Sequence, residues 1–192
     1  MRRWMWVAAL VAIASSVAGA VAQDAEPGPV VDATLDSIRG GRRSLHDERG
    51  RRMIALFYED RPHVEDNEQL KGELNRFISG NHLENRLVVL GVANLGDLGN
   101  DAPRDLVRTM IRPLLDRWGV EILLDWDGVM RRAPFGFRTN AANTALVSTE
   151  GRIVYRHTGP MDREQTTAFY RTLRQHLRAA PQQVAGVQGP NR

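Results

Sequence analysis

The stretch Met53–Asn67, with the sequence MIALFYEDRPHVEDN, decides the fold. Its first six residues, Met53–Tyr58, are apolar without interruption, which is typical of a strand buried on both faces of a sheet. The charged turn Glu59–Pro62 ends this strand, and Asp66 with Gln69 three residues later forms the capping-box pattern that begins a helix. Strand, polar loop and helix in this order indicate an α/β protein, in which functional groups gather beyond the carboxyl ends of the strands.

The rest of the chain continues this alternation. Apolar spacing and turn residues predict the following elements: a hairpin within 33–45, a helix over 66–80, a buried strand over 86–95, a helix over 101–118 that Pro113 interrupts, a strand over 120–124, a hairpin of strands 144–148 and 153–156, and a closing helix that begins at a second capping box, Asp162 with Gln165. This order predicts a mixed sheet with helices on both faces, that is, a three-layer α/β/α sandwich.

The amino-terminal end of the chain has the pattern of a secretory signal peptide over residues 1–22. Met1-Arg2-Arg3 is positively charged, the stretch to Ala22 is apolar, and it ends in the small-x-small triplet Ala20-Val21-Ala22. An uncleaved anchor helix is the alternative, because the apolar stretch approaches the length that spans a bilayer. We expect an exported protein, periplasmic or secreted, with no membrane contact after cleavage.

Three further segments follow the predicted signal peptide. Residues 23–31 read as a polar, proline-bearing linker, and residues 179–192 have the composition of a disordered tail. The segment between them, residues 32–178, has the length and apolar periodicity of one folded domain.

Composition excludes several classes of function. The chain contains no cysteine, so disulfides, thiolate catalysis, thiolate metal sites and a lipid-modified cysteine are all ruled out. The formal net charge is only +3, and the arginines are scattered among acidic residues, so we expect no nucleic-acid partner. Lys71 is the only lysine in the chain.

Three segments together resemble the exported branch of the thioredoxin-like superfamily. Leu35–Leu45 is similar to the family's entry hairpin, Gly50–Tyr58 to its "G-K-x-x-x-x-x-F-W" strand, and Thr144–Gly159 to its "T-x-x-I-D-x-x-G-x-I-x-x-x-x-x-G" hairpin. The resemblance covers about residues 32–178, and the cysteine-poor periplasmic YtfJ-like group looks most similar. It implies a thioredoxin-like fold with an N-terminal hairpin extension.

The resemblance fails at the positions that carry the family's chemistry. It places Pro62 and Glu65 where the family has its two redox cysteines, and Ala142 where it has a cis-proline. Thiol–disulfide exchange and thiol peroxidase chemistry both need a thiolate, which this chain lacks. A cis peptide bond before a residue other than proline is costly, so we expect a trans bond before Ala142.

The charged loop after the first long strand supplies candidate binding residues, namely Glu59, Asp60, Arg61 and His63. One interpretation is a solvated loop and a helix start, where acidic residues are favoured. The other is a divalent metal site, with His63, Glu65 and Asp66 as the candidate ligands.

The irregular segment 125–143 supplies a second set of candidates, Trp126, Phe135 and Phe137, beside several arginines. These aromatic residues either fold back as a small additional core or form an apolar face for a peptide or protein. The sequence therefore predicts a non-redox binding or accessory protein of the cell envelope with an unknown protein or peptide partner and no cofactor. No catalytic residues emerge, and a metal-binding protein or metal-dependent enzyme and a structural envelope protein stay open as alternatives.

Overall fold

The computed structural model describes residues 28–98 and 103–179. The predicted signal peptide, most of the predicted linker and the tail beyond residue 179 lie outside this part of the chain. The elements are β1 (Thr34–Ser37), β2 (Arg42–Ser44), η1 (Leu45–Glu48), β3 (Met53–Glu59), η2 (Arg61–His63), α1 (Glu68–Gly80), β4 (Leu87–Asn94), α2 (Arg104–Ile111), α3 (Pro113–Trp118), β5 (Glu121–Asp125), η3 (Val129–Arg131), β6 (Ala142–Val147), β7 (Ile153–Thr158) and α4 (Arg163–Ala179).

The strands form one mixed sheet of seven in the order β2-β1-β5-β4-β3-β6-β7. β3, the strand predicted from Met53–Tyr58, lies between β4, to which it is parallel, and β6, to which it is antiparallel. All seven of its residues are buried, as an unbroken apolar run predicts for a central strand. The two predicted hairpins, β1–β2 and β6–β7, are both confirmed.

Alternate residues of β3 contribute to two separate cores. Met53, Ala55 and Phe57 belong to one hydrophobic cluster, which also contains buried residues of α1 and α4. Ile54, Leu56 and Tyr58 belong to the other. Because side chains alternate across a strand, this assignment also places Glu59 on the same face of the sheet as Phe57.

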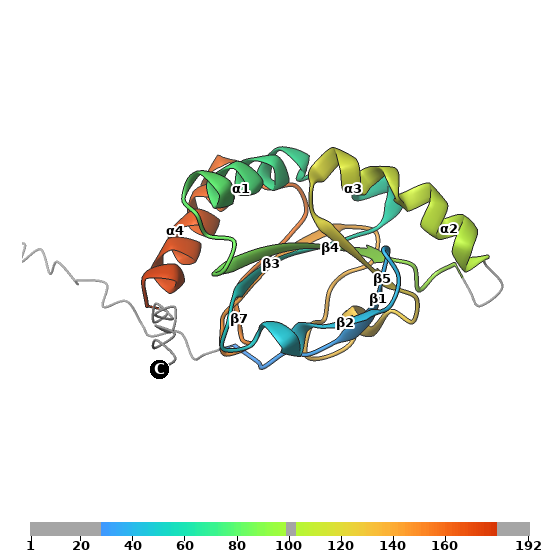
Figure 1. Cartoon of the computed structure of the whole chain (residues 1–192), viewed down its shortest axis with the longest axis horizontal. Helices are drawn as coiled ribbons and strands as arrows, with labels where there is room; N and C mark the ends of the chain where they lie inside the picture. Colours follow the sequence, from blue (N-terminus) through green and yellow to red (C-terminus); the bar gives the residue numbers. More distant parts are fainter. Residues whose placement is uncertain (1–27, 99–102, 180–192) are drawn as a thin grey trace, which may run out of the picture.

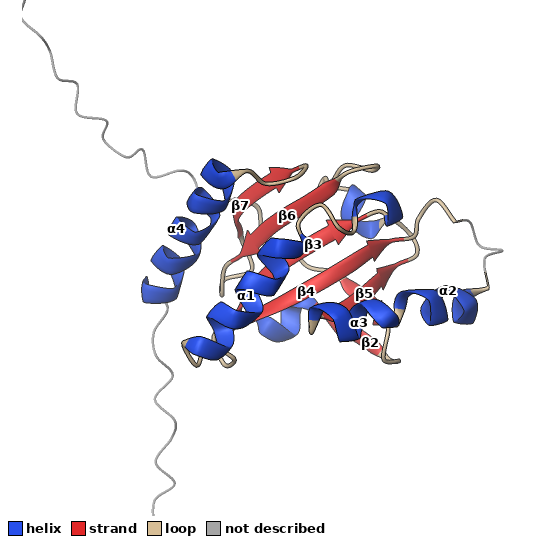
Figure 2. Ribbon diagram, turned by 90° about the horizontal axis from the view of Figure 1, so that it is seen from above, coloured by secondary structure: helices blue, strands red, loops and turns tan. Residues whose placement is uncertain are grey.

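All four α-helices in the described residues cover the first of these faces. Leu74 of α1 and Phe169 of α4 lie in its core, and Val107 of α2 and Leu114 of α3 pack against it. The helices lie above the sheet in Figure 1 and side by side over it in Figure 2. The prediction of helices on both faces is wrong in this respect. β3, β4 and β5 follow one another in a single direction across the sheet, so two right-handed crossovers place their helices on the same face.

Within residues 28–98 and 103–179, the other face is covered by chain without α-helices. Its cluster includes Val31 and Leu35 from the amino-terminal part, and Met130, Phe135 and Phe137 from the segment between β5 and β6. Val31 was assigned to the linker, but it is 1% exposed and its N–H donates to the Gly151 carbonyl at 2.8 Å.

The two expected capping boxes have different outcomes. At α4 the pattern is confirmed, because the Asp162 carboxylate accepts from the Glu164 and Gln165 backbone N–H groups and the Gln165 side chain accepts from the Asp162 N–H. At α1 the prediction that Asp66 caps the helix is wrong. The helix begins after Asn67, and the Asp66 carboxylate is bound to His63 instead.

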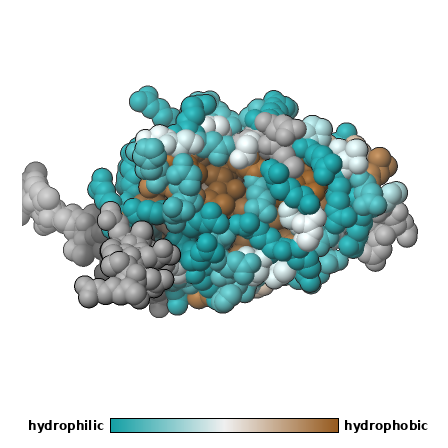
Figure 3. Space-filling view, in the orientation of Figure 1, coloured by the Kyte–Doolittle hydropathy of each residue, from teal (hydrophilic) through white to brown (hydrophobic). Residues whose placement is uncertain are grey.

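Polar side chains cover most of the surface seen in Figure 3, with apolar surface showing between the helices and the sheet and at the α2 end. Leu98, Leu106 and Met110 are the large apolar residues most exposed there, at 50%, 57% and 57%. None of the helices in the described ranges is long and apolar enough to cross a membrane.

Candidate functional site

β3 ends in a buried ion pair. Glu59 was expected in a solvated loop, but it is the last residue of the strand and only 5% exposed. Its Oε2 accepts from the Lys71 Nζ at 2.5 Å, and Lys71, on α1, is 1% exposed. The Lys71 ammonium also donates to the Val64 carbonyl at 2.9 Å and lies 5.4 Å from the centre of the Phe57 ring. The pair therefore joins the carboxyl end of β3, the following loop and the first turn of α1.

Burial governs the acid–base properties of this pair. Removal from water raises the pKa of Glu59 to about 7, although the neighbouring Lys71 favours the charged carboxylate. Burial likewise lowers the pKa of Lys71, against the effect of Glu59. The second carboxylate oxygen, Oε1 of Glu59, has no hydrogen-bond partner among the residues that the structure describes. Such an acceptor is costly unless a donor reaches it.

A pocket of about 610 Å³ lies beside this carboxylate. Glu59 and the end of β4 form the wall of the pocket on the side of the sheet, and residues of α2 and α3 line the opposite side. Gly91 lies on the pocket side of β4, and the lack of a side chain there leaves space. We call it the β4/α2 pocket; it is lined by Glu59, Arg61, Pro62, Val64, Glu65, Gly91, Val92, Ala93, Asn94, Leu95, Leu98, Val107, Met110, Ile111, Leu114 and Ile122.

Part of the mouth of the β4/α2 pocket is apolar and exposed to solvent. Leu98 and Met110 line the pocket and are each at least half exposed to solvent. Arg61, also in the lining, is exposed, and no salt bridge of its side chain occurs within the described residues. Apolar surface of this kind, continuous with a concave site, is typical of a binding region.

α2 is held over the pocket by contacts on its outer side. Arg108 of α2 forms a salt bridge with Asp36 of β1 at 3.1 Å. The Trp126 indole N–H donates to the same carboxylate at 3.1 Å, and the Arg104 guanidinium lies 4.9 Å from the centre of the indole ring. Trp126 thus links α2 to β1 through Asp36.

The other two aromatic candidates are core residues. Phe135 and Phe137 are 1% and 4% exposed, and Phe137 stacks on Tyr58 with ring centres 5.3 Å apart. Of the two interpretations of segment 125–143, the structure supports the additional core, because burial removes both rings from contact with a partner.

The candidate metal ligands do not converge. His63 Nδ1 is 2.8 Å from the Asp66 Oδ2, while the Arg117 guanidinium binds Glu65 at 3.0 Å and Glu68 at 2.7 Å. The hydrogen bond to Asp66 raises the pKa of His63. No group of three or more His, Cys, Asp or Glu side chains suited to a metal ion occurs in residues 28–98 and 103–179. The carboxylates of Glu65, Asp66 and Glu68 are thus already paired with protein side chains.

Two of the three positions that correspond to the redox site border the β4/α2 pocket. Pro62 and Glu65 are exposed and border the β4/α2 pocket, whereas Ala142 is fully buried at the start of β6 and does not line that pocket. The only cis peptide bond in the described residues precedes Pro134, so the expectation of a trans bond at Ala142 is confirmed. Asp60 connects the two regions, because it accepts from the Asn94 side chain at 2.5 Å and from the Asn140 N–H.

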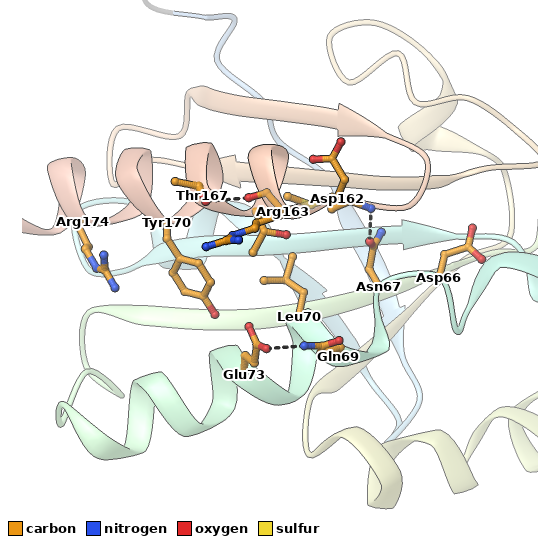
Figure 4. A pocket seen from close by; sticks show the side chains of 12 residues that line it. Asp66, Asn67, Gln69, Leu70, Glu73, Asp162, Arg163, Thr167, Tyr170 and Arg174 are labelled. Atoms are coloured by element: carbon orange, nitrogen blue, oxygen red, sulfur yellow. Dashed lines mark hydrogen bonds between the residues drawn. The ribbon is translucent and has the colours of Figure 1, made fainter.

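A second hollow, of about 500 Å³, lies between α1 and α4 on the same face of the sheet (Figure 4). It is more polar and carries charges of both signs, including Glu73, Arg163 and Arg174. The buried Asn67 lies at one end, where its side chain accepts from the Met161 N–H at 3.0 Å. We call it the α1/α4 hollow.

Sequence reasoning missed the Glu59–Lys71 pair, although a signal was present. Lys71 is the only lysine of the chain and lies at helical spacing with Leu74 and Ile78, so it shares their inward face. An inward lysine needs an acidic partner, and Glu59 directly follows the buried strand.

Several solved structures have a backbone similar to that of this chain. A protein described as a thiol:disulfide interchange protein DsbE from Chlorobium tepidum superimposes with a TM-score of 0.59 at 15% identity over 79% of this chain and 96% of its own. The exposed lipoprotein thioredoxin of Streptococcus pneumoniae gives 0.55 at 21% identity over 76% and 99%. A DsbF homologue from Corynebacterium diphtheriae gives 0.57 at 11% identity over 79% and 88%.

These matches establish a thioredoxin-like α/β fold with a seven-stranded mixed sheet, flanking helices and an N-terminal hairpin. They confirm the predicted fold class. No protein-family model matches the sequence, and no curated protein does. At these identities the likeness concerns the fold alone, and this chain has no cysteine with which to perform thiol chemistry.

Proposed function

We propose that this chain is an exported, non-redox thioredoxin-fold protein that binds a segment of a protein or peptide partner in the β4/α2 pocket. The observation that carries the proposal is the pocket itself, an apolar site of about 610 Å³ beside the carboxyl ends of β3 and β4. In α/β folds this end of the sheet is where ligands bind.

The exposed rim favours a macromolecular partner over an enclosed small molecule. Leu98 and Met110 extend the apolar surface outward from the pocket, and half or more of each side chain faces solvent. A peptide segment that inserts one apolar side chain and lies across the rim would cover this surface.

Export and relatedness are part of the same proposal. The signal-peptide pattern of residues 1–22 supports a periplasmic or secreted location, in which a cysteine-free thioredoxin fold acts as an accessory protein. The local sequence patterns support a place near the YtfJ-like group.

A pocket-filling variant tests the proposal. Gly91 has an ordinary strand conformation, and a Cβ added there would meet its nearest neighbour, the Ile122 Cγ1, at 3.6 Å. Gly91→Val is therefore compatible with the strand and fills the pocket floor. Peptides selected from a random library against the wild-type protein are expected to be rich in apolar side chains and to lose binding to Gly91→Val.

Gly80→Ala is the matched control, because a methyl group at Gly80 meets no atom within 4 Å and lies outside the pocket lining. It should bind the selected peptides as the wild type does. Selected peptides that bind Gly91→Val undiminished, or amide shifts on titration that avoid Gly91–Leu95, would contradict the proposal.

A further inference from the structure

The wall of the β4/α2 pocket contains one polar group that the fold leaves incomplete. Glu59 is 5% exposed, its Oε2 is bound to Lys71 at 2.5 Å, and its Oε1 has no partner in the described part of the chain. Glu59 lines the pocket, and a carboxylate oxygen that the fold leaves unpaired there gains a hydrogen bond when a donor group of a ligand reaches it.

The other charged groups of the lining do not compete for this role. Glu65 is bound to Arg117 at 3.0 Å and is exposed at the pocket mouth. Arg61 is also exposed, where water solvates its guanidinium. Among the described side chains that line the pocket, only Glu59 combines burial with an acceptor that has no hydrogen-bond partner.

We propose, building on the function proposed above, that the β4/α2 pocket selects an apolar group that carries an uncharged N–H or O–H donor, and that this donor binds Glu59 Oε1. Glu59 is then the specificity-determining residue of the pocket, while Gly91, Leu95, Ile111 and Leu114 receive the apolar part.

The charges of Glu59 and Lys71 determine which charge the donor group of the ligand can carry. Lys71 already supplies the positive counterpart of the Glu59 carboxylate and is 1% exposed. A cationic donor would bring a second positive charge close to the Lys71 ammonium, and an anionic group would meet the carboxylate. An uncharged donor satisfies Oε1 without either repulsion, and a backbone amide or a hydroxyl group has this chemistry.

Two pairs of small probes test the inference by nuclear magnetic resonance titration of the wild-type protein. The amide arm compares N-acetyl-leucine N-methylamide with its analogue in which both amide nitrogens are methylated. The alcohol arm compares 4-methylpentan-1-ol with its methyl ether. In at least one arm the donor-bearing probe should bind roughly tenfold tighter, with shifts at Gly91–Leu95, and the arm in which it does so identifies the source of the donor.

Variants of the pair show whether Glu59 is responsible. The double variant Glu59→Leu/Lys71→Met removes the acceptor and replaces the ion pair by apolar side chains, so the preference should disappear. Glu59→Gln keeps the shape, and because the Lys71 ammonium donates, the glutamine carbonyl faces Lys71 and its N–H₂ group takes the place of Oε1. The preference should therefore fall or reverse, and this variant replaces the double variant if the latter does not fold. Glu65→Gln, a carboxylate at the same pocket mouth, is the matched control and should retain the preference.

The outcomes separate this inference from the proposed function. If both members of each pair bind equally to the wild type and both are blocked by Gly91→Val, the donor preference is overturned while apolar binding stands. A preference that persists in the double variant also overturns it, because another group must then be the acceptor. If no probe binds and library selection fails as well, both proposals are overturned.

Discussion

Two clusters of opposite charges hold the loop after β3 to its surroundings, and they differ in burial. In the first, the Glu59 and Lys71 side chains are 5% and 1% exposed and their atoms are 2.5 Å apart. In the second, Arg117 contacts Glu65 at 3.0 Å and Glu68 at 2.7 Å, and these three side chains are 49%, 68% and 34% exposed. The contact distances are similar, so the energetic difference between the clusters comes from the different exposure of their side chains to water.

In the exposed cluster, solvent and salt screen the attraction, and the long side chains lose entropy when they are held in place. In the buried pair, both ions have left water, and each is tolerated only because the other is present. The comparison teaches that burial determines how much stability is lost when one partner of a close carboxylate–cation contact is removed. It also identifies the buried pair as the one that affects the β4/α2 pocket.

Loss of the buried cation should have the largest effect. Lys71→Met leaves Glu59 buried without its partner, so its carboxyl group must take up a proton on folding, and the Lys71 hydrogen bonds to Glu59 and Val64 are lost. We expect the free energy of unfolding to fall by roughly 3–5 kcal/mol. Urea unfolding at neutral pH, followed by circular dichroism, measures this. The double variant Glu59→Leu/Lys71→Met should recover most of the loss, because no unpaired charge remains. If Lys71→Met is as stable as the wild type, burial does not distinguish the two clusters.

The pH dependence of stability should come next in size. In the unfolded chain Glu59 titrates near its ordinary pKa of 4.5, and in the folded protein burial raises that pKa to about 7. Between these values the folded state binds more protons, so the stability contributed by Glu59 is complete below pH 4.5 and is lost as the pH rises through about 7. From the size of this shift we expect a loss on the order of 3 kcal/mol.

Glu59→Gln isolates this effect because glutamine does not titrate. The free energy of unfolding of the wild type should fall relative to that of Glu59→Gln between pH 5 and pH 8. The lowered pKa of Lys71 acts in the opposite sense, since it adds stability as the pH rises toward its ordinary value of 10.5. Equal pH profiles for the two proteins would mean that Glu59 keeps its ordinary pKa in the folded state.

The elements of the fold could be predicted because their signals are local. The apolar run Met53–Tyr58 predicted the central strand, Pro113 the division between α2 and α3, and Asp162 the start of α4. The placement of the four described α-helices on one face could not be predicted in this way, because it depends on the order of strands in the sheet, which the local pattern did not supply.

The candidate site was harder to predict because its residues meet only in three dimensions. Loop residues such as His63 were identified by type, yet their partners, Asp66 for His63 and Arg117 for Glu65, were not. Asn67 was overlooked, although its buried side chain joins the start of α1 to the Met161 N–H and the Gly159 carbonyl. A long-range contact of this kind has no periodicity in the sequence.

The exposed cluster should tolerate loss of its cation. In Arg117→Ala, Glu65 and Glu68 are left in water, which solvates them, so we expect the urea midpoint to stay close to that of the wild type. Any difference should shrink further at high salt, because the original attraction is screened there. A destabilisation comparable to that of Lys71→Met, and insensitive to salt, would show that exposure does not separate the two clusters.

The smallest effect should be confined to one side chain. The hydrogen bond from His63 Nδ1 to Asp66 raises the pKa of this exposed histidine, so the charged form is favoured in the folded state. Its contribution to stability is present below the ordinary pKa of 6.5 and is lost as the pH rises through the raised value. In Asp66→Asn, the pKa of His63 measured by nuclear magnetic resonance should return toward its ordinary value, whereas Glu73→Gln should leave it unchanged. If Asp66→Asn also leaves it unchanged, the hydrogen bond is not maintained in solution, and the loop depends on the buried pair and Asn67 for its position.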